Sequence, residues 1–249
     1  MKLARFAPQR KRVVRALLLG VAVSVAVTAV SRIGALSGWE TRAVDAFLFL
    51  RDRVPAPEIV LVAIDEEAFR ELGERQPLSR RYLADLGDFL LRSGARVVAF
   101  DILPRSPSDP EEDAALLGMT HRWGTGGAGR LVFASLAIPS RGAGEARYQE
   151  APPFSPELRG LFGFSNAPLG ADGVIRRMAP LLPAEGGGFL PSFALAVLAG
   201  YGGHTAERLS RALGGKDGEA IPLPVRDANG RARDEPISLG RLSEGQWRI

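Results

Sequence analysis

Residues 59–101 read IVLVAIDEEAFRELGERQPLSRRYLADLGDFLLRSGARVVAFD and contain two short apolar runs with a helical pattern between them. The first run, 59–64, ends at Asp65, and the second, 97–100, ends at Asp101. Short apolar runs rich in β-branched residues are typical of buried strands. Two such strands joined through a helix predict a βαβ unit with a parallel strand pair.

The helix between the two runs has clear start and stop signals. Ser79 is a favourable N-cap, and Gly94 stands where a left-handed residue can end the helix. Apolar residues recur between them at helical spacing, namely Leu83, Leu86 and Leu90. We therefore predict an α/β fold in which a mixed sheet has a βαβ core.

A pair of carboxylates would stand at the ends of the two predicted strands. Neighbouring parallel strands lie about 4.8 Å apart, so Asp65 and Asp101 would approach each other at the edge where open α/β sheets bind ligands. Arg80, at the start of the intervening helix, would neutralise them or meet an anionic ligand. The structural alternative is that Asp65 caps a short helix and that Asp101 pairs with an arginine.

The charge distribution argues against a nucleic-acid-binding protein. The chain has 249 residues, no cysteine and a net charge of +4. Residues 1–15 carry six of the basic residues and no acidic one, which leaves the rest of the chain close to neutral. A nucleic-acid reader carries its basic surface on the folded domain. Without cysteine, disulfides and zinc–thiolate sites are excluded.

An uncharged apolar stretch follows the basic tail at 16–30. We predict a transmembrane helix over 16–36, with the basic tail 1–15 in the cytoplasm and the following domain outside. A signal peptide cleaved after Ala29 and a buried core helix are the alternatives. A second helix is predicted at 39–53, with Trp39 placed for the outer membrane interface.

Further elements are predicted downstream. Asp109 is a helix N-cap, followed by Pro110 and by Glu112 as the partner of a capping box. An Asp172-Gly173 turn is expected to join two strands. The remaining predicted elements are a strand at 131–138, the two joined strands at 161–165 and 174–182, an apolar helix at 191–200, and an exposed helix followed by irregular or edge-strand segments in 204–240.

Several of these segments together resemble the CHASE2 family of extracytoplasmic sensor domains in bacterial signalling proteins. The matching stretches are VLVAIDEEAF at 60–69, LSRRYLADLGDFLLRSGARVVAFDILP at 78–104 and GFSNAPLGADGVIRRMAPLL at 163–182. The motif residues before, between and within these stretches are Glu40, Arg42, Asp45, Asp113, Ala114, Leu116, Gly163, Asn166, Asp172, Gly173, Val174 and Arg176. The resemblance implies a sensor domain over 39–249.

The chain also departs from the family pattern. An aromatic residue that is common in the family near 76–78 is missing here. Family members usually continue past the point that corresponds to Ile249 with further strands, membrane spans and a cyclase, kinase or phosphatase. We therefore expect the domain to be incomplete at its C-terminus and its output to lie outside this chain.

Catalytic motifs are weak. The run Gly124, Gly126 and Gly129 satisfies G-x-G-x-x-G but follows a predicted helix, whereas a dinucleotide loop follows a strand. Only His121 and His204 are present, and no G-x-S-x-G or H-E-x-x-H motif accompanies them. Arg176 is a candidate anion contact, or else one half of a salt bridge.

The sequence thus favours a membrane-anchored sensor of the inner membrane, with the domain in the periplasm and no enzymatic activity of its own. Candidate ligand contacts are Asp65, Arg80, Asp101 and Arg176. Asp109, Asp113, Asn166, Asp172 and Gly173 are expected to shape the structure. No cofactor and no nucleic-acid partner is expected. The expected partners are the membrane, a small ligand, an output domain and a second copy of the chain. The alternatives are a divalent-metal phosphoesterase using Asp65 and Asp101, and a structural envelope protein.

Overall fold

The computed structural model divides the chain into two units, Met1–Ala63 and Ile64–Ile249. Each unit is described separately below. The structure describes residues 7–32, 37–51, 56, 58–74, 76–124, 130–140, 146–170, 172–176, 178–214, 221–226, 232–237, 240–241 and 247–248.

The first unit contains two helices, α1 (Ala7–Arg32) and α2 (Ser37–Leu50). Within α1, the window Arg12–Val30 has a mean hydropathy of 2.3 and is long and apolar enough to cross a membrane. Both helices are where the sequence predicts them, although residues 33–36 of the predicted span lie outside the described part of the chain.

The predicted strand at 59–64 is wrong. These residues belong to no strand, and the run from Ile59 to Val62 is exposed. Ile64, the last residue of the run and the first of the second unit, packs against the core of that unit. Apolar composition identified a strand-like segment but carried no information about a pairing partner.

The main sheet begins at the second predicted strand, and its other strands follow later in the chain. It contains β1 (Val98–Phe100), β2 (Leu131–Ser135) and β5 (Phe162–Phe164) in the order β1-β2-β5, all parallel. The helix α5 (Pro110–Trp123) connects β1 to β2, so the α/β class and the presence of a βαβ core are confirmed, but the unit consists of β1, α5 and β2 and not of the predicted residues 59–101. The start signals of α5 also hold, because Asp109 is its N-cap and Pro110 its first residue.

Three phenylalanines form a row across this sheet. Phe100, Phe133 and Phe162 occupy paired positions on the three strands. The ring centroids of Phe100 and Phe133 are 5.3 Å apart, and those of Phe133 and Phe162 are 5.9 Å apart. The three buried rings belong to one core with Leu83 and Leu116.

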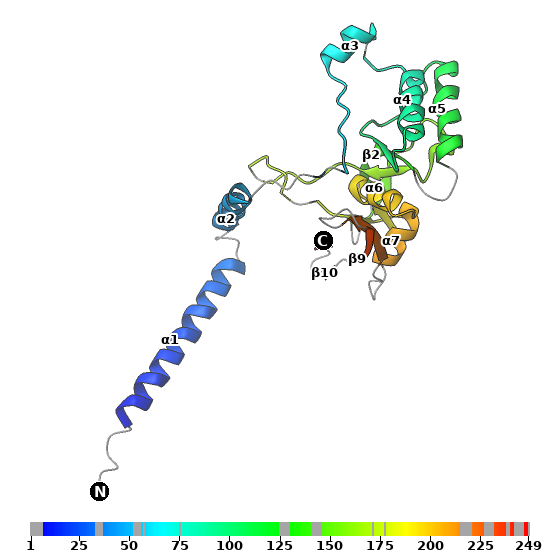
Figure 1. Ribbon diagram of the computed structural model, residues 1–249. Coiled ribbons are helices and arrows are strands. Elements are labelled where there is room, and N and C mark those ends of the chain that lie inside the picture. Colours follow the sequence, from blue (N-terminus) through cyan, green and yellow to red (C-terminus); the bar gives the residue numbers. More distant parts are fainter. Residues whose placement is uncertain are drawn as a thin grey trace. The chain divides into compact units, whose positions relative to one another are not determined.

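Two helices cover this face of the sheet, α5 and α4 (Arg80–Arg92) (Figure 1). The predicted capping of α4 is confirmed, since Ser79 is the N-cap and Gly94 has a φ of 101°. Where α4 and α5 meet, Gly87 leaves the space that the buried Met119 side chain fills. The core therefore depends on close approach between the two helices as well as on the phenylalanine row.

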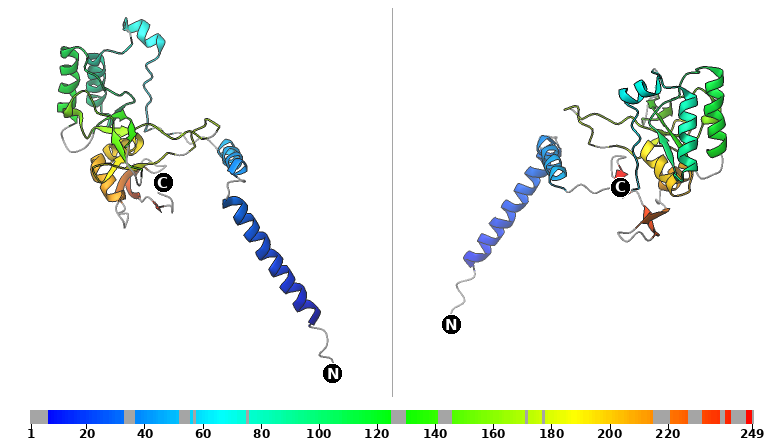
Figure 2. Two further views of the ribbon diagram at one scale, coloured as in Figure 1. Left: turned by 180° about the vertical axis from the view of Figure 1, so that it is seen from behind. Right: turned by 45° about the horizontal axis from the view of Figure 1, so that its top comes forward.

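On the opposite face, α6 (Phe193–Tyr201) packs against β2 and β5, and α7 (Ala206–Gly214) packs against α6 and β7 (Phe189–Pro191). The two helix pairs stay on opposite sides of the sheet in the turned views of Figure 2. The prediction of an exposed helix after His204 is wrong for one side of α7, because Leu209 and Leu213 are fully buried in a second core. The amphipathic spacing of those leucines determines which side of α7 is covered.

The remaining elements are short. A seven-residue helix, α3 (Glu66–Leu72), precedes α4, and a 3₁₀ turn, η1 (Pro156–Leu158), precedes β5. The other strands pair as antiparallel ribbons: β3 (Ala137–Pro139) with β4 (Tyr148–Glu150), β6 (Leu181–Pro183) with β7 (Phe189–Pro191), β8 (Ile221–Arg226) with β9 (Ala232–Ile237), and β10 (Gly240–Arg241) with β11 (Trp247–Arg248).

These ribbons correct two predictions. The single strand expected at 131–138 is divided at Leu136 into β2 and β3, which belong to different sheets. The hairpin expected around Asp172-Gly173 is wrong, because β5 pairs with β2 while β6 pairs with β7. The turn itself is present, and Gly173 has a φ of 77°.

Gly163 offers a direct test of this packing. A Cβ atom placed there would lie 2.6 Å from the Cα of Phe193 and 2.7 Å from the carbonyl oxygen of Ser192, both backbone atoms that start α6. We expect Gly163→Ala to lower the free energy of unfolding by about 3 kcal/mol, because neither backbone atom can move aside cheaply.

Gly186→Ala is the matched control, since that glycine is exposed and has open space where the Cβ would stand. It should be neutral or stabilising by about 0.5 kcal/mol. Denaturant melts of the two variants provide the comparison, and equal midpoints would show that β5 and α6 do not pack as described.

Candidate functional site

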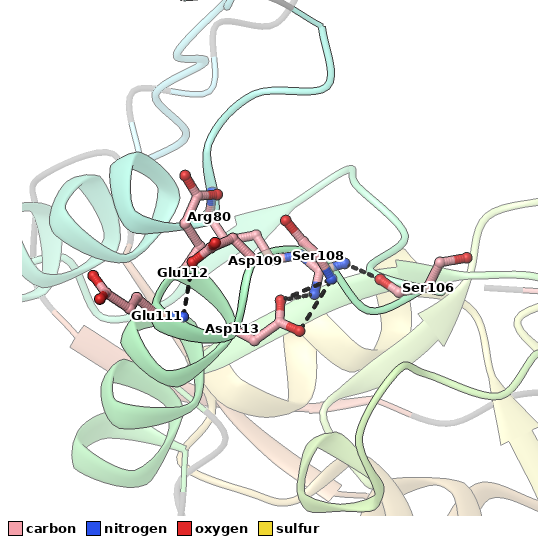
Figure 3. Close-up of polar contacts among 7 residues, drawn as sticks. All are labelled: Arg80, Ser106, Ser108, Asp109, Glu111, Glu112 and Asp113. Carbon is pink, nitrogen blue, oxygen red and sulfur yellow. Dashed lines mark hydrogen bonds and ion pairs between the residues drawn. The ribbon is translucent and has the colours of Figure 1, made fainter.

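The best-organised polar site lies where α4 and α5 both begin, and Arg80 is at its centre (Figure 3). The guanidinium of Arg80 donates to the carboxylate of Asp113 and to the carbonyl oxygen of Ser106. Its carbon stands 4.1 Å from the ring centroid of Phe154, within cation–π distance. The side chains of Arg80 and Asp113 are only 12% and 15% exposed, so this ion pair is largely removed from water.

Backbone hydrogen bonds extend this arrangement, which we call the Arg80 cluster (Arg80, Ser106, Ser108, Glu112 and Asp113). The backbone N–H of Arg80 donates to Oε2 of Glu112 at 3.0 Å. The backbone N–H of Ser108 donates to Oδ2 of Asp113 at 3.1 Å. The cluster therefore ties the start of α4, the loop between β1 and α5, and the start of α5 together.

Glu112 corrects one detail of the predicted helix start. In a capping box its carboxylate would return to the backbone N–H of Asp109. Instead it accepts from Arg80, while the Asp109 side chain accepts from the backbone N–H of Glu111 at 2.9 Å. Placing acidic residues in the first turn of α5 remains favourable, because the positive end of the helix dipole lies there.

The two strand-end aspartates are not arranged as predicted. Residues 58–64, directly before Asp65, form no strand, so the expectation that Asp65 and Asp101 end neighbouring strands is wrong. Asp65 is the N-cap of α3 and accepts from the backbone N–H of Ala68 at 3.0 Å, which is the structural alternative. Asp101 follows β1, is exposed, and has no hydrogen bond or ion pair with another residue in the described ranges.

Arg80 and Arg176 also have partners other than those first considered. The contacts of the Arg80 guanidinium are with Asp113, Ser106 and Phe154 rather than with either strand-end aspartate. Arg176 forms an ion pair with Asp172, with N and O atoms 2.8 Å apart. Three of the four candidate ligand residues, Asp65, Arg80 and Arg176, are thus engaged in separate local contacts, and they do not converge with Asp101 on one site.

Asp172 organises the turn that the family motif contains. Its carboxylate accepts from Arg176 and from the backbone N–H of Val174. The hydrogen bonds from Arg176 and then Val174 lower the pKa of Asp172 to about 2. Gly173 between them adopts a left-handed conformation that glycine favours. This part of the motif therefore has a structural explanation.

Asn166 acts as a substitute for a neighbouring strand. Its Oδ1 accepts from the backbone N–H of Ala137 at 2.8 Å, and its Nδ2 donates to the backbone carbonyl of Ala137 at 3.1 Å. One amide side chain thus pairs both backbone groups of Ala137 at the start of β3. The sequence marks Asn166 as a motif residue, but its partner lies 29 positions away and leaves no local signal.

Two further polar groups were missed by sequence reasoning. Asp88 accepts from Arg122 at 2.6 Å and from the indole N–H of Trp123 at 2.6 Å, which connects α4 to the end of α5. Glu150 stands opposite the buried Ala137 in the β3–β4 ribbon. Burial raises the pKa of Glu150 to about 7. No sequence motif indicates either environment.

The described residues offer little for a metal or a dinucleotide. No group of three or more His, Asp or Glu side chains suited to a metal ion is present among them. His121 contacts Glu157 at 2.7 Å. Of the G-x-G-x-x-G run, Gly124 ends α5, while Gly126 and Gly129 lie outside the described residues.

Comparison with protein-family models shows which family the chain belongs to. The model of the CHASE2 domain matches residues 19–243. The chain therefore belongs to the CHASE2 family, a family of extracellular sensor domains. No curated protein and no solved structure matches the chain.

The Arg80–Asp113 pair gives a prediction about the stability of the site. Asp113→Ala would leave the guanidinium of Arg80 largely buried without its carboxylate. We expect it to cost about 3 kcal/mol in the free energy of unfolding, whereas replacing an exposed pair costs about 0.5 kcal/mol.

Arg81→Ala is the exposed comparison, because Arg81 and Glu111 are both well exposed and their atoms are 3.4 Å apart. Urea melts of the two variants test the difference. If Asp113→Ala were no more costly than Arg81→Ala, the Arg80 cluster would not hold the β1–α5 loop.

Glu150 gives a prediction about pH. Its pKa is raised in the folded state, so the folded protein binds the proton more tightly than the unfolded chain does. The stabilising effect is complete below the unfolded pKa of 4.5 and is lost as the pH rises to about 7. Complete linkage would amount to about 3 kcal/mol, which residual contact with water reduces.

Glu150→Gln removes this titration. Relative to the native chain, the variant should become progressively more stable from pH 4.5 to about 7, with a constant difference above that. Denaturant melts at a series of pH values measure the difference, which cancels the titration of other carboxylates. A difference that does not vary with pH would mean that Glu150 is solvated.

Proposed function

We propose that this chain is the membrane-anchored input domain of a bacterial transmembrane receptor, with its N-terminus in the cytoplasm and its α/β domain outside. The observation that carries the proposal is the extent of the family match. It begins at residue 19, inside the apolar part of α1, and continues through the α/β domain. A segment shared in this way favours a permanent anchor over a leader that is removed.

Charge supports the proposed orientation. The basic residues of the tail lie before the apolar window Arg12–Val30 or in its first four positions, and positive charge accumulates on the cytoplasmic side of membrane spans. The 19 residues of that window would extend about 28 Å as a helix, close to the thickness of the hydrocarbon core. Signal output would be produced by a domain or partner outside this chain.

Asp101 is an exposed charged residue at the carboxyl edge of the main sheet. It follows β1 and precedes the loop that the Arg80 cluster holds. Ligands of open α/β sheets bind at this edge. In the proposed function a small ligand contacts Asp101, and the Arg80 cluster transmits the change between the β1–α5 loop and α4. Arg80 would reach an anionic ligand only by leaving Asp113.

Topology is the first test. A reporter enzyme that is active only outside the cytoplasm, fused after Arg53, should be active, because the span carries that position across the membrane. Activity from a cytoplasmic reporter at the same position would reverse the orientation. N-terminal sequencing of the mature protein separates an anchor from a leader, since cleavage after Ala29 would remove the proposed anchor.

The ligand edge is the second test, with Asp65 as the matched control. In the full-length receptor, Asp101→Asn should change signalling output without a change in melting temperature, because the exposed Asp101 side chain has no hydrogen bond or ion pair with another described residue. Asp65→Asn should leave output unchanged, because Asn caps a helix about as well as Asp.

Asp65→Ala completes the comparison. It should lower the free energy of local unfolding of α3 by about 1 kcal/mol and so increase the rate of amide hydrogen exchange in α3 about fivefold. Native output from Asp101→Asn would remove Asp101 from the ligand site. A change in output from Asp65→Asn would show that Asp65 does more than cap α3.

A further inference from the structure

The position of α2 along the chain keeps it close to the proposed membrane. The apolar window of α1 ends at Val30, and α2 begins at Ser37. Seven residues extend at most about 25 Å, so α2 cannot start further than this from the edge of the hydrocarbon layer. This bound comes from chain length alone and holds for any arrangement of the α/β domain.

One side of α2 is apolar along its whole length. Trp39, Ala43, Ala46, Phe47 and Leu50 recur at the i, i+4, i+7, i+8 and i+11 spacing of a single helix face. The structure leaves that face open, since Trp39 is 70% exposed, Phe47 71% and Leu50 79%. Large apolar side chains gathered in this way are typical of a surface that binds a partner.

The opposite side of α2 is different. It contains the polar residues Thr41, Arg42 and Asp45, and the apolar residues Val44, Leu48 and Phe49 lie between and after them. The guanidinium carbon of Arg42 lies 5.7 Å from the ring centroid of Trp39, which brings a cation beside the aromatic end of the apolar face. Aromatic rings and arginines that border an apolar helix face are typical of helices at a membrane surface.

We propose that α2 lies in the outer interface of the membrane, with its apolar face against the lipid acyl chains and Thr41 and Asp45 toward water. A lipid surface suits this face better than a second protein does, because the link to α1 keeps α2 at the membrane whatever else the receptor binds. The proposal rests on the proposed function, since it requires α1 to span the membrane. It adds a second membrane contact between the span and the sensor domain.

Spin labels test the proposal directly, because the chain has no cysteine of its own. Single substitutions Ala43→Cys, Phe47→Cys and Leu50→Cys sample the apolar face, and Thr41→Cys and Asp45→Cys sample the opposite face. Val21→Cys reports on α1. The labelled full chain is reconstituted in vesicles of phosphatidylcholine and phosphatidylglycerol, and collision rates with oxygen and with a water-soluble nickel complex are measured.

In the interfacial arrangement, oxygen collisions exceed nickel collisions severalfold at 43, 47 and 50, and the ratio reverses at 41 and 45. The ratio then varies with the helical period. Circular dichroism of each labelled variant checks that the helices remain formed. Ala43→Cys is the milder substitution, so it provides a second measurement of the same face if Phe47→Cys perturbs the helix.

Other results would overturn the proposal. High nickel collision rates at every α2 position, with an oxygen-rich signal at 21, would leave the anchor intact and place α2 in water. Low collision rates with both reagents at 43, 47 and 50 would mean that protein covers the face, and spectral broadening between labels would identify a second copy. A water-exposed label at 21 would contradict the proposed anchor itself.

Discussion

The phenylalanine row is the constraint on which the α/β domain depends. Phe100, Phe133 and Phe162 occupy paired positions on β1, β2 and β5, so one register places all three rings in contact. A shift of one residue in any strand would turn its phenylalanine to the other face and leave a large cavity. The row determines where α4 and α5 pack, and through them where both helices begin.

The Arg80 cluster is a consequence of that packing. Because α4 and α5 lie side by side on the phenylalanine row, their first turns are adjacent. Acidic residues are favoured in the first turn of α5, and Asp113 there forms an ion pair with Arg80 of α4. Arginine suits this place because its planar group can bond a carboxylate and a carbonyl while one face rests on the ring of Phe154. A lysine could not make the same set of contacts.

The family motif that begins in β5 has mainly a structural meaning in this chain. Gly163 is required by the approach of the α6 backbone, Asn166 pairs Ala137, and Gly173 turns the chain beside the Asp172–Arg176 pair. These residues shape the edge of the domain and do not converge on one pocket. For a sensor, such a frame allows the ligand contacts to differ between family members while the fold persists, because binding residues are carried on loops.

Local features of this protein were readable from sequence because they depend on neighbours a few residues away. Ser79 and Asp109 cap helices, Gly94 and Gly173 adopt left-handed conformations, and α1 has the length and composition of a span. Tertiary structure decided the rest. The strand pairing, the pairing of Arg80 with Asp113, the burial of Glu150 and the covered side of α7 all join residues distant in sequence. The apolar run 59–64 illustrates the physical reason. The hydrophobic effect favours burial of such a run but is non-directional, so the sequence does not determine which segment the run packs or pairs with.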